Sequence, residues 1–279
     1  MSRYVLHNGH LHHDDTAVIT ASSRGFRYGE GCFETMRLVN GIIPLWDYHY
    51  DRLLSSLHKL KFEVGKLLGK EILESKILEL AQKNGNDKHA KIRLDVYRGP
   101  ENDDNEPGSN YVLETFDADC LELPKDGITI GLFEDAKKHY SEFSMLKTHS
   151  RLEYTIASQR AKALSCDDML ILNGHNRVAE ACVSNIFIYK SNTLVTPPLT
   201  EACIDGVMRR YLLRELKEAG FKVVEEPVTV LDVMNSKEVF LSNAFRGIRP
   251  VKCFGSIQYK QEVSTHIFNS IIKPLMSVA

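Results

Sequence analysis

Four histidines near the start of the chain, His7, His10, His12 and His13, are residues whose types and spacing could bind a metal ion. They flank the Asn8-Gly9 dipeptide, which is typical of a tight turn between two short strands. Successive strand residues point to opposite faces, and no carboxylate lies at helical spacing to complete a ligand set. We therefore expect a surface hairpin here and no metal site.

The six cysteines could do redox chemistry or bind zinc, and they lie far apart, at Cys32, Cys120, Cys166, Cys182, Cys203 and Cys253. No pair forms a C-x-x-C motif, and no cysteine and histidine have zinc-finger spacing. Without an export signal the thiols should stay reduced, and a free buried cysteine packs as a small hydrophobe. For Cys182, which lies near other informative residues, we expect a packing role.

Common catalytic signatures are absent from the sequence. It contains no G-x-S-x-G, no H-E-x-x-H, no P-loop and no G-x-G-x-x-G after a predicted strand. The motif Gly29-Glu30-Gly31 alone indicates only a tight turn. Taken singly, Lys147 is interpreted as a solvated loop lysine. Glu180 is flanked by small and apolar residues, which favours a sheltered carboxylate over an exposed strand-end glutamate. Arg52 fits a phosphate-binding arginine and an arginine on the solvent face of a helix equally well.

A set of short segments in a fixed order is more informative than any single motif. Each segment is weak alone, since H-x-x-R-L occurs by chance, but together they run through most of the chain. The segments are Ser23–Thr35, His49–Leu53, Lys147–Glu153, Val178–Phe187, Thr196–Leu199 with Ile204–Arg209, and, more weakly, Ser242–Ala244 with Ile248–Val251.

These ordered segments resemble the class IV, or fold-type IV, pyridoxal-phosphate enzymes. That family includes branched-chain aminotransferases, D-amino-acid aminotransferases and 4-amino-4-deoxychorismate lyases. The resemblance implies an α/β (α+β) protein of two domains with the D-amino-acid aminotransferase-like fold. It also implies a pyridoxal 5'-phosphate cofactor, a small-molecule substrate and a homodimer.

The resemblance also assigns roles to individual residues. Pyridoxal phosphate needs an amine for its resting Schiff base, and the resemblance assigns this role to Lys147. It also needs an anion that keeps its pyridine nitrogen protonated, and the resemblance assigns this role to Glu180. The phosphate needs a planar fork, supplied by Arg52, and free N–H groups, supplied where a helix begins after Gly206. The cofactor-binding residues implied in this way are Arg52, Glu180, Ser184, Asn185, Val207, Met208, Asn243 and Ala244.

Several departures from the aminotransferase pattern indicate which branch of the family the chain resembles. After Arg98-Gly99 the chain lacks the R-x-H element of D-amino-acid aminotransferases, and Leu152 stands where branched-chain enzymes usually carry a tyrosine. Met208 and Ala244 stand where many aminotransferases have a hydroxyl. By contrast, the Lys147-x-x-x-Arg151-Leu152-Glu153 pattern looks like the lyase branch.

These departures favour the conversion of 4-amino-4-deoxychorismate to 4-aminobenzoate and pyruvate, a step of folate biosynthesis. No amino group passes to a second substrate, and one lysine can serve as cofactor partner and as acid and base. The alternative is a class IV aminotransferase acting on branched-chain or related amino acids with 2-oxoglutarate. A third hypothesis is a degenerate member that binds without turnover, against which intact Lys147, Glu180 and Arg52 argue. Candidate partners for the two substrate carboxylates are Arg27, Arg98, Arg151, Arg246 and Arg249.

Length and composition indicate the number of domains and exclude some classes of partner. The 279 residues, 43% of them hydrophobic, are enough for about two domains with their own cores. A net charge of -2 without a basic stripe argues against a nucleic-acid partner. No run approaches the roughly 20 apolar residues that span a bilayer, and the start has no signal-peptide core, so we expect a cytoplasmic protein.

The predicted organisation is a small N-terminal α/β domain (1–117), a linker (118–126) and a larger α/β domain (127–279) that carries Lys147. In the first domain we expect strands at 4–7, 32–39, 42–44, 90–97 and 110–116, helices from 47 and over 66–83, and an irregular loop at 99–108. In the 66–83 helix we expect Leu67, Ile72, Ile77 and Leu80 to point inward. In the second domain we expect strands at 128–133, 169–172, 186–189, 194–196, 222–225 and 238–241, and helices at 151–164, 206–219 and 265–276.

Overall fold

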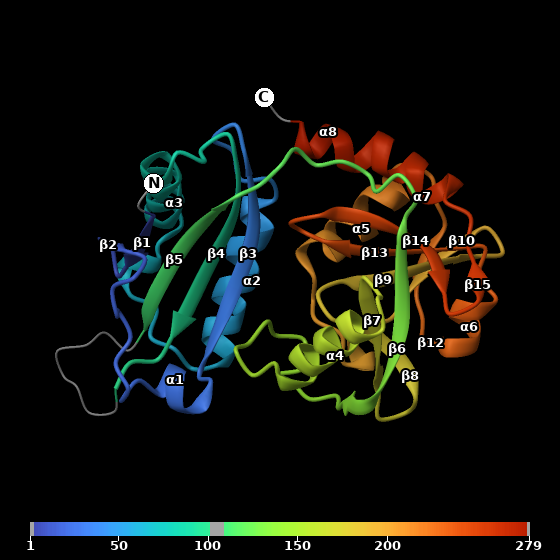
Figure 1. Cartoon of the computed structure of the whole chain (residues 1–279), viewed down its shortest axis with the longest axis horizontal. Helices are drawn as coiled ribbons and strands as arrows, with labels where there is room; N and C mark the ends of the chain where they lie inside the picture. The colour runs from blue at the N-terminus through green and yellow to red at the C-terminus, as the bar shows by residue number, and fades with distance from the viewer. Residues whose placement is uncertain (1–2, 101–108, 278–279) are drawn as a thin grey trace. The chain divides into compact units, whose positions relative to one another are not determined.

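The computed structural model of the chain describes residues 3–100 and 109–277 and splits into two compact units (Figure 1). Unit 1 comprises Met1–Cys120, Lys147–Ser150 and Met276–Ala279, and unit 2 comprises Leu121–Leu146 and Arg151–Leu275. The boundary after Cys120 falls inside the predicted linker. The Lys147–Ser150 segment groups with unit 1, whereas the sequence placed it in the larger domain. Most of the predicted 99–108 loop lies outside the described residues.

Unit 1 is built on a five-stranded antiparallel sheet with the order β2-β1-β5-β4-β3. Helix α2 packs against β3, and α3 packs against β1 and β5. The elements are β1 (Tyr4–His7), β2 (His10–His13), α1 (Arg24–Tyr28), β3 (Gly31–Val39), α2 (Trp46–Lys59), α3 (Lys70–Asn84), β4 (His89–Tyr97) and β5 (Asn110–Asp117), with a 3-10 turn at Lys66–Leu68.

The core of unit 1 lies between the two helices and one face of this sheet. Side chains alternate along a strand, so every second residue reaches that core. The fully buried contributors include Leu6, Met36, Leu94 and Leu113 from the sheet, Leu53 and Leu57 from α2, and Leu73, Ile77 and Leu80 from α3. The intervening strand residues, such as Phe33 and Asp95, belong to the opposite face of the sheet.

Three predictions for unit 1 are wrong in detail. Helix α3 begins at Lys70 rather than Lys66, because Gly69 is extended and precedes the first helical residue. Leu67 and Ile72, predicted to point inward, are 43% and 42% exposed, while Leu73 is fully buried. The expected 42–44 strand reduces to a single bridge between Val39 and Ile42.

The histidine-rich hairpin forms as predicted, with His7 opposite His10 across the Asn8-Gly9 turn. His7 Nε2 lies 2.8 Å from the Tyr97 hydroxyl. Within residues 3–100 and 109–277 there is no group of three or more His, Cys, Asp or Glu residues that could hold a metal ion. In the same ranges no helix is long and apolar enough to cross a membrane.

Unit 2 is built on a curled ten-stranded sheet with the path β11-β10-β9-β13-β14-β6-β7-β8-β12, and β15 pairs with β14. The strands are β6 (Ile128–Lys138), β7 (Asp168–Asn173), β8 (Arg177–Ala181), β9 (Asn185–Lys190), β10 (Thr193–Thr196), β11 (Val223–Glu225), β12 (Val228–Thr229), β13 (Glu238–Asn243), β14 (Gly247–Phe254) and β15 (Ile257–Gln258). The helices are α4 (Leu152–Ala163), α5 (Val207–Glu218), α6 (Val230–Met234), α7 (Glu262–Ile267) and α8 (Lys273–Met276), with a 3-10 turn at Leu199–Glu201 and a π-helical turn at Phe268–Ile272.

The two faces of the curled sheet have different roles. One face closes around a core that includes Ile130, Leu170, Ile186 and Leu241. The other face is covered in part by α4, which packs on β6 and β7, and by α5, which packs on β13 and β11. The sequence did not predict β8 or β14, and the C-terminal helix begins at Glu262 instead of Thr265 and contains the π-helical turn.

Candidate active site

A buried ion-pair network in unit 1 fixes Arg52. Its Nε donates to Glu34 Oε1 at 2.7 Å and its Nη2 donates to Glu34 Oε2 at 2.6 Å. His49 Nδ1 lies 2.7 Å from the same Oε2. His49 and Arg52 are three residues apart on α2, so both face β3, where Glu34 lies. The bidentate contact holds the guanidinium plane in one orientation.

The charges of this network follow from its contacts. Burial would raise the pKa of Glu34, but Arg52 and His49 outweigh it and lower that pKa to about 2. Burial lowers the pKa of His49, against the opposing effect of Glu34, and the charges of Arg52 and Lys147 lower it further. The imidazole is therefore neutral near pH 7, with Nδ1–H donating to Glu34. Its Nε2 is buried and has no hydrogen-bond partner among the described residues.

Lys147 lies in a short extended segment that adds to the edge of β3. Phe33 N–H donates to the Lys147 carbonyl at 2.9 Å, and His149 N–H donates to the Gly31 carbonyl at 3.1 Å. The Nζ of Lys147 lies 4.6 Å from the centre of the Phe33 ring. This pairing is the reason that the segment groups with unit 1.

Glu180 is the centre of a buried network in unit 2. Its Oε1 lies 2.5 Å from Lys138 Nζ and accepts a 2.7 Å hydrogen bond from the Tyr154 hydroxyl. Its Oε2 accepts from Ile204 N–H at 3.1 Å and more weakly from Asn185 Nδ2 at 3.5 Å. Burial and the neighbouring Glu180 raise the pKa of Tyr154 well above its usual value, so its hydroxyl remains a donor.

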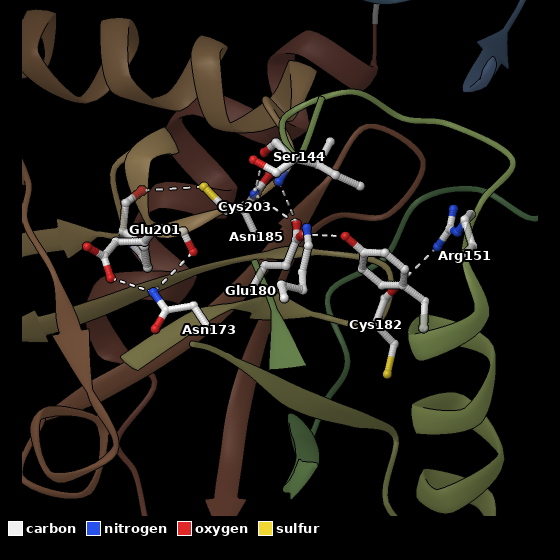
Figure 2. A network of polar contacts seen from close by, with 12 residues as sticks. Ser144, Arg151, Asn173, Glu180, Cys182, Asn185, Glu201 and Cys203 are labelled. Atoms are coloured by element: carbon white, nitrogen blue, oxygen red, sulfur yellow. Dashed lines mark hydrogen bonds and ion pairs between the residues drawn. The ribbon is translucent and has the colours of Figure 1, made fainter. Parts of the chain in front are cut away.

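Figure 2 shows Glu180 and Asn185 next to each other in this network, with Arg151 to one side and Asn173 and Glu201 to the other. Glu180 is only 2% exposed, which agrees with the sheltered carboxylate expected from the sequence rather than with an exposed strand end. A buried carboxylate needs a partner of opposite charge, and Lys138 is that partner here.

The beginning of α5 and the residues around it form a second cluster of polar atoms in unit 2. Val207 and Met208 are its first residues, and the amides of a first helical turn have no acceptor within the helix. Gly206 precedes them, and a Cβ there would lie 1.9 Å from Asn185 Oδ1. Only glycine therefore lets Asn185 approach this helix start, where its Nδ2 also donates to the Ile204 carbonyl.

The remaining predicted cofactor residues continue this group. Asn243 Nδ2 donates to Ser184 Oγ at 3.0 Å and to the Val183 carbonyl at 3.2 Å. Ser242 pairs with Asn185 across β13 and β9, which places Ala244 just beyond the same strand ends. Unit 2 thus brings together Glu180, Ser184, Asn185, Val207, Met208, Asn243 and Ala244, while unit 1 holds Lys147 and Arg52.

The candidate substrate arginines have different surroundings. Arg27 is exposed and donates to the Ala21 carbonyl. Arg98 forms an ion pair with Glu30 at 3.0 Å and lies over the Phe62 ring. Both arginines therefore serve local contacts in unit 1.

The other three arginines lie in unit 2. Arg249 is buried and forms a 2.8 Å ion pair with Asp168, a structural contact. Arg151 donates to the Cys182 carbonyl at 3.2 Å, and Arg246 is exposed.

Sequence reasoning missed three residues of these networks. His49 lies within the H-x-x-R-L segment, and its spacing of three from Arg52 is the signal that places both on one helix face. Glu34 lies within the Ser23–Thr35 segment, but its pairing with Arg52 depends on the packing of α2 on β3. Lys138 has no motif, and only the fold brings it to Glu180.

The chain is similar to known proteins in sequence and in fold. The sequence profile of the family described as Amino-transferase class IV matches residues 31–254. A protein of Methanocaldococcus jannaschii assigned as a branched-chain-amino-acid aminotransferase is 29% identical over 251 residues, which cover 88% of this chain and 85% of that protein. Aminodeoxychorismate lyase from Bacillus subtilis is 28% identical over 268 residues, or 90% of this chain and 87% of the relative. The branched-chain aminotransferase of Thermoproteus uzoniensis, solved with norvaline, matches with a TM-score of 0.88 at 23% identity, covering 99% of this chain and 95% of that one.

The fold and the family profile together define a pyridoxal-phosphate-dependent enzyme of fold-type IV. Because the profile spans most of the sequence, the chain belongs to the class IV aminotransferase family. Pyridoxal phosphate is therefore its cofactor.

The residues present fit that cofactor. The unpartnered Nε2 of His49 lies beside Arg52, and a phosphate dianion would favour the imidazolium form, whose Nε2–H is a donor. The start of α5 offers backbone N–H groups that have no acceptor within the helix. Glu180 offers the buried anion that a protonated pyridine nitrogen needs.

Proposed function

We propose that this chain converts 4-amino-4-deoxychorismate to 4-aminobenzoate and pyruvate, a lyase reaction of folate biosynthesis. The observation that carries the proposal lies just after Lys147. Leu152, at the position of the aminotransferase tyrosine, is 70% exposed, and the nearby Tyr154 hydroxyl donates to Glu180. This segment therefore supplies no tyrosine hydroxyl of the aminotransferase type. The similarity to the Bacillus subtilis lyase supports the same assignment.

Each proposed role follows from the contacts of the residue. When bound, pyridoxal phosphate supplies a carbonyl that condenses with an amine and a ring that takes up the electron pair of a broken C–H bond. Lys147 holds the cofactor in the resting enzyme and then accepts the proton from the amine-bearing carbon of the substrate. Glu180 keeps the pyridine nitrogen protonated, with Lys138 and Tyr154 fixing its carboxylate.

The phosphate and the substrate are held by separate groups. In unit 1, Arg52, oriented by Glu34, is the proposed phosphate ligand. In unit 2, the amides of Val207 and Met208 are the proposed phosphate ligands. Of the arginine candidates in unit 2, we propose Arg151 and Arg246 for the substrate carboxylates, because Arg249 is already paired with Asp168. The chain acts as a homodimer, which light scattering under assay conditions tests; an active monomer would refute this.

The test is incubation of the purified enzyme with 4-amino-4-deoxychorismate while 4-aminobenzoate and pyruvate are measured. We expect equal amounts of both products and no requirement for 2-oxoglutarate. A higher specificity constant for L-leucine, L-glutamate or D-alanine as amino donor would contradict the lyase assignment.

The second candidate is a class IV aminotransferase acting on branched-chain or related amino acids with 2-oxoglutarate. The similarity to the Methanocaldococcus jannaschii protein favours it. Stoichiometric conversion of the enzyme to its pyridoxamine form by an amino acid alone would support this candidate. Cofactor binding without either activity would indicate a degenerate member of the family.

A further inference from the structure

The segment that carries Lys147 also carries a histidine on the same face of the unit 1 sheet. Thr148 forms a bridge with Cys32, so Lys147 lies opposite Phe33 and His149 lies opposite Gly31. Residues two apart on an extended segment project to the same side. Both side chains also contact one ring, since His149 stacks on Phe33 with ring centres 6.1 Å apart and Lys147 Nζ lies over it. His149 is therefore a neighbour of the amine-bearing lysine.

Gly31 determines where the imidazole of His149 can lie. A Cβ built at Gly31 would lie 2.5 Å from His149 Nδ1 and 2.6 Å from its Cε1, so the ring occupies the space of the missing side chain. By crossing Gly31 the ring reaches β4, where His149 Nε2 lies 2.9 Å from Asp95 Oδ1. The glycine that the sequence indicated only as part of a turn thus opens the path for a histidine–carboxylate contact.

Asp95 is itself fixed in place. Arg93 Nε donates to Asp95 Oδ2 at 2.6 Å, and Arg93 Nη2 donates to Oδ1 at 2.7 Å. Burial would raise the pKa of Asp95, but the His149 and Arg93 contacts outweigh it and lower that pKa. An ionised carboxylate only accepts hydrogen bonds, so Nε2 of His149 carries the proton and Nδ1 is the basic atom.

We propose that His149, oriented by Asp95, is a second acid–base residue of the reaction, acting beside Lys147. This inference rests on the proposed lyase function. The reaction moves two protons: one leaves the amine-bearing ring carbon, and one is needed by the oxygen of the departing enolpyruvyl group. A lysine that has just accepted the first proton leaves the second role to another group.

The proposed step balances as follows. Lys147 accepts the proton of the ring carbon, the C–O bond to the enolpyruvyl group breaks, and its electron pair stays on oxygen. That oxygen takes the Nδ1 proton of the His149 imidazolium and departs as the enol of pyruvate, which rearranges to pyruvate. Lys147 then releases its proton to water, and neutral His149 takes one up, so the enzyme returns to its starting state.

The charges that face His149 come from each element packed against it. Lys147 lies on its own segment, Asp95 and behind it Arg93 come from β4, and Tyr97 lies in the next row of β4, opposite Gly31. The imidazole therefore faces one carboxylate, that of Asp95, and two cations, Lys147 and Arg93. Asp95 is the group in direct contact with it.

The first test measures the tautomer rather than turnover. In holoenzyme labelled with 15N-histidine, the His149 signals are identified by their absence from His149→Asn. We expect a protonated Nε2 and a bare Nδ1 in neutral His149, and loss of this preference in Asp95→Asn. A neutral His149 protonated on Nδ1 would overturn the proposal, whatever reaction the enzyme catalyses.

The second test separates the two proton transfers in deuterated water. In His149→Asn and His149→Gln we expect 4-aminobenzoate formation to fall at least about a hundredfold. Exchange of the substrate's ring-carbon proton, measured on recovered substrate, should continue because Lys147 is intact. His58→Asn, an exposed histidine on α2, is the matched control and should retain both rates.

The outcomes distinguish the inference from the proposed function. Equal loss of exchange and product formation would make His149 a structural residue and overturn the proposal, as would near wild-type product formation. If the histidine variants do not fold, the same two rates are measured in Asp95→Asn. We again expect product formation to fall while proton exchange continues. Absence of 4-aminobenzoate from the wild-type reaction would instead refute the lyase function, and the tautomer measurement would still test the His149–Asp95 pair.

Discussion

Replacing Glu34 by glutamine removes one negative charge from the network that orients Arg52. The side chain keeps its size but can no longer balance the buried guanidinium, which it contacts at 2.6 and 2.7 Å. Breaking a buried ion pair by removing one partner typically costs about 3–5 kcal/mol, because the other charge stays buried and uncompensated. We therefore expect Glu34→Gln to fold with reduced stability and to bind pyridoxal phosphate less tightly.

The pKa of Glu34 gives an independent value for its contribution to folding stability. Folding lowers it from 4.5 to about 2. A lowered carboxylate pKa stabilises the folded state above the unfolded pKa, and this contribution disappears as the pH falls through the folded pKa. The shift corresponds to about 3 kcal/mol near pH 7, which agrees with the ion-pair value. About 1 kcal/mol of this contribution to folding stability should be lost when the pH is lowered to about 3.5.

The assay is urea unfolding of wild type and Glu34→Gln at both pH values. We expect a stability difference of about 3 kcal/mol near pH 7 that narrows on acidification. Glu30→Gln is the matched control, because Glu30 pairs with Arg24 at 32% exposure and should cost less than about 1 kcal/mol. A Glu34→Gln variant within about 1 kcal/mol of wild type near pH 7, or a difference that does not change with pH, would refute this reasoning.

Three further predictions concern residues of the proposed cofactor site. Arg52→Ala should weaken pyridoxal phosphate binding, measured by absorbance titration, with activity partly rescued by excess cofactor; unchanged affinity would place Arg52 outside the phosphate site. Glu180→Gln should still bind cofactor but lose about 3 kcal/mol of transition-state stabilisation in kcat/KM, and near wild-type turnover would make the carboxylate structural. Lys138→Met should destabilise the fold by about 3–5 kcal/mol in urea unfolding, since it leaves Glu180 without its buried cation, and a loss under about 1 kcal/mol would contradict that pairing.

The fold was predictable where local signals and tertiary packing agree. Helix α2, helix α5 and strands such as β7 have clear periodicity, and their positions match the expected ranges to within a few residues. Strand β14 escaped prediction because Pro250 lies within it, and proline argues against a central strand. The false start of α3 has a local cause as well, since an apolar pattern continues through Gly69 although the helix does not.

Only those residues of the candidate site that lie in the ordered motifs could be predicted from the sequence. Lys147, Glu180 and Arg52 were found through the resemblance of short segments to a known family. Their partners depend on contacts between distant positions, such as Lys138 with Glu180, 42 residues apart. Sequence spacing does not encode such pairs, whereas the packing of β6 against β7 and of β7 against β8 brings them together.

The proposed function requires that Lys147 carries pyridoxal phosphate. Borohydride reduction of the holoenzyme, followed by digestion and mass spectrometry, locates the lysine that bears the reduced cofactor. We expect a single labelled peptide with the modification on Lys147 and none on Lys138, the buried lysine beside Glu180. Recovery of the cofactor on Lys138, or on any lysine other than Lys147, would contradict the account.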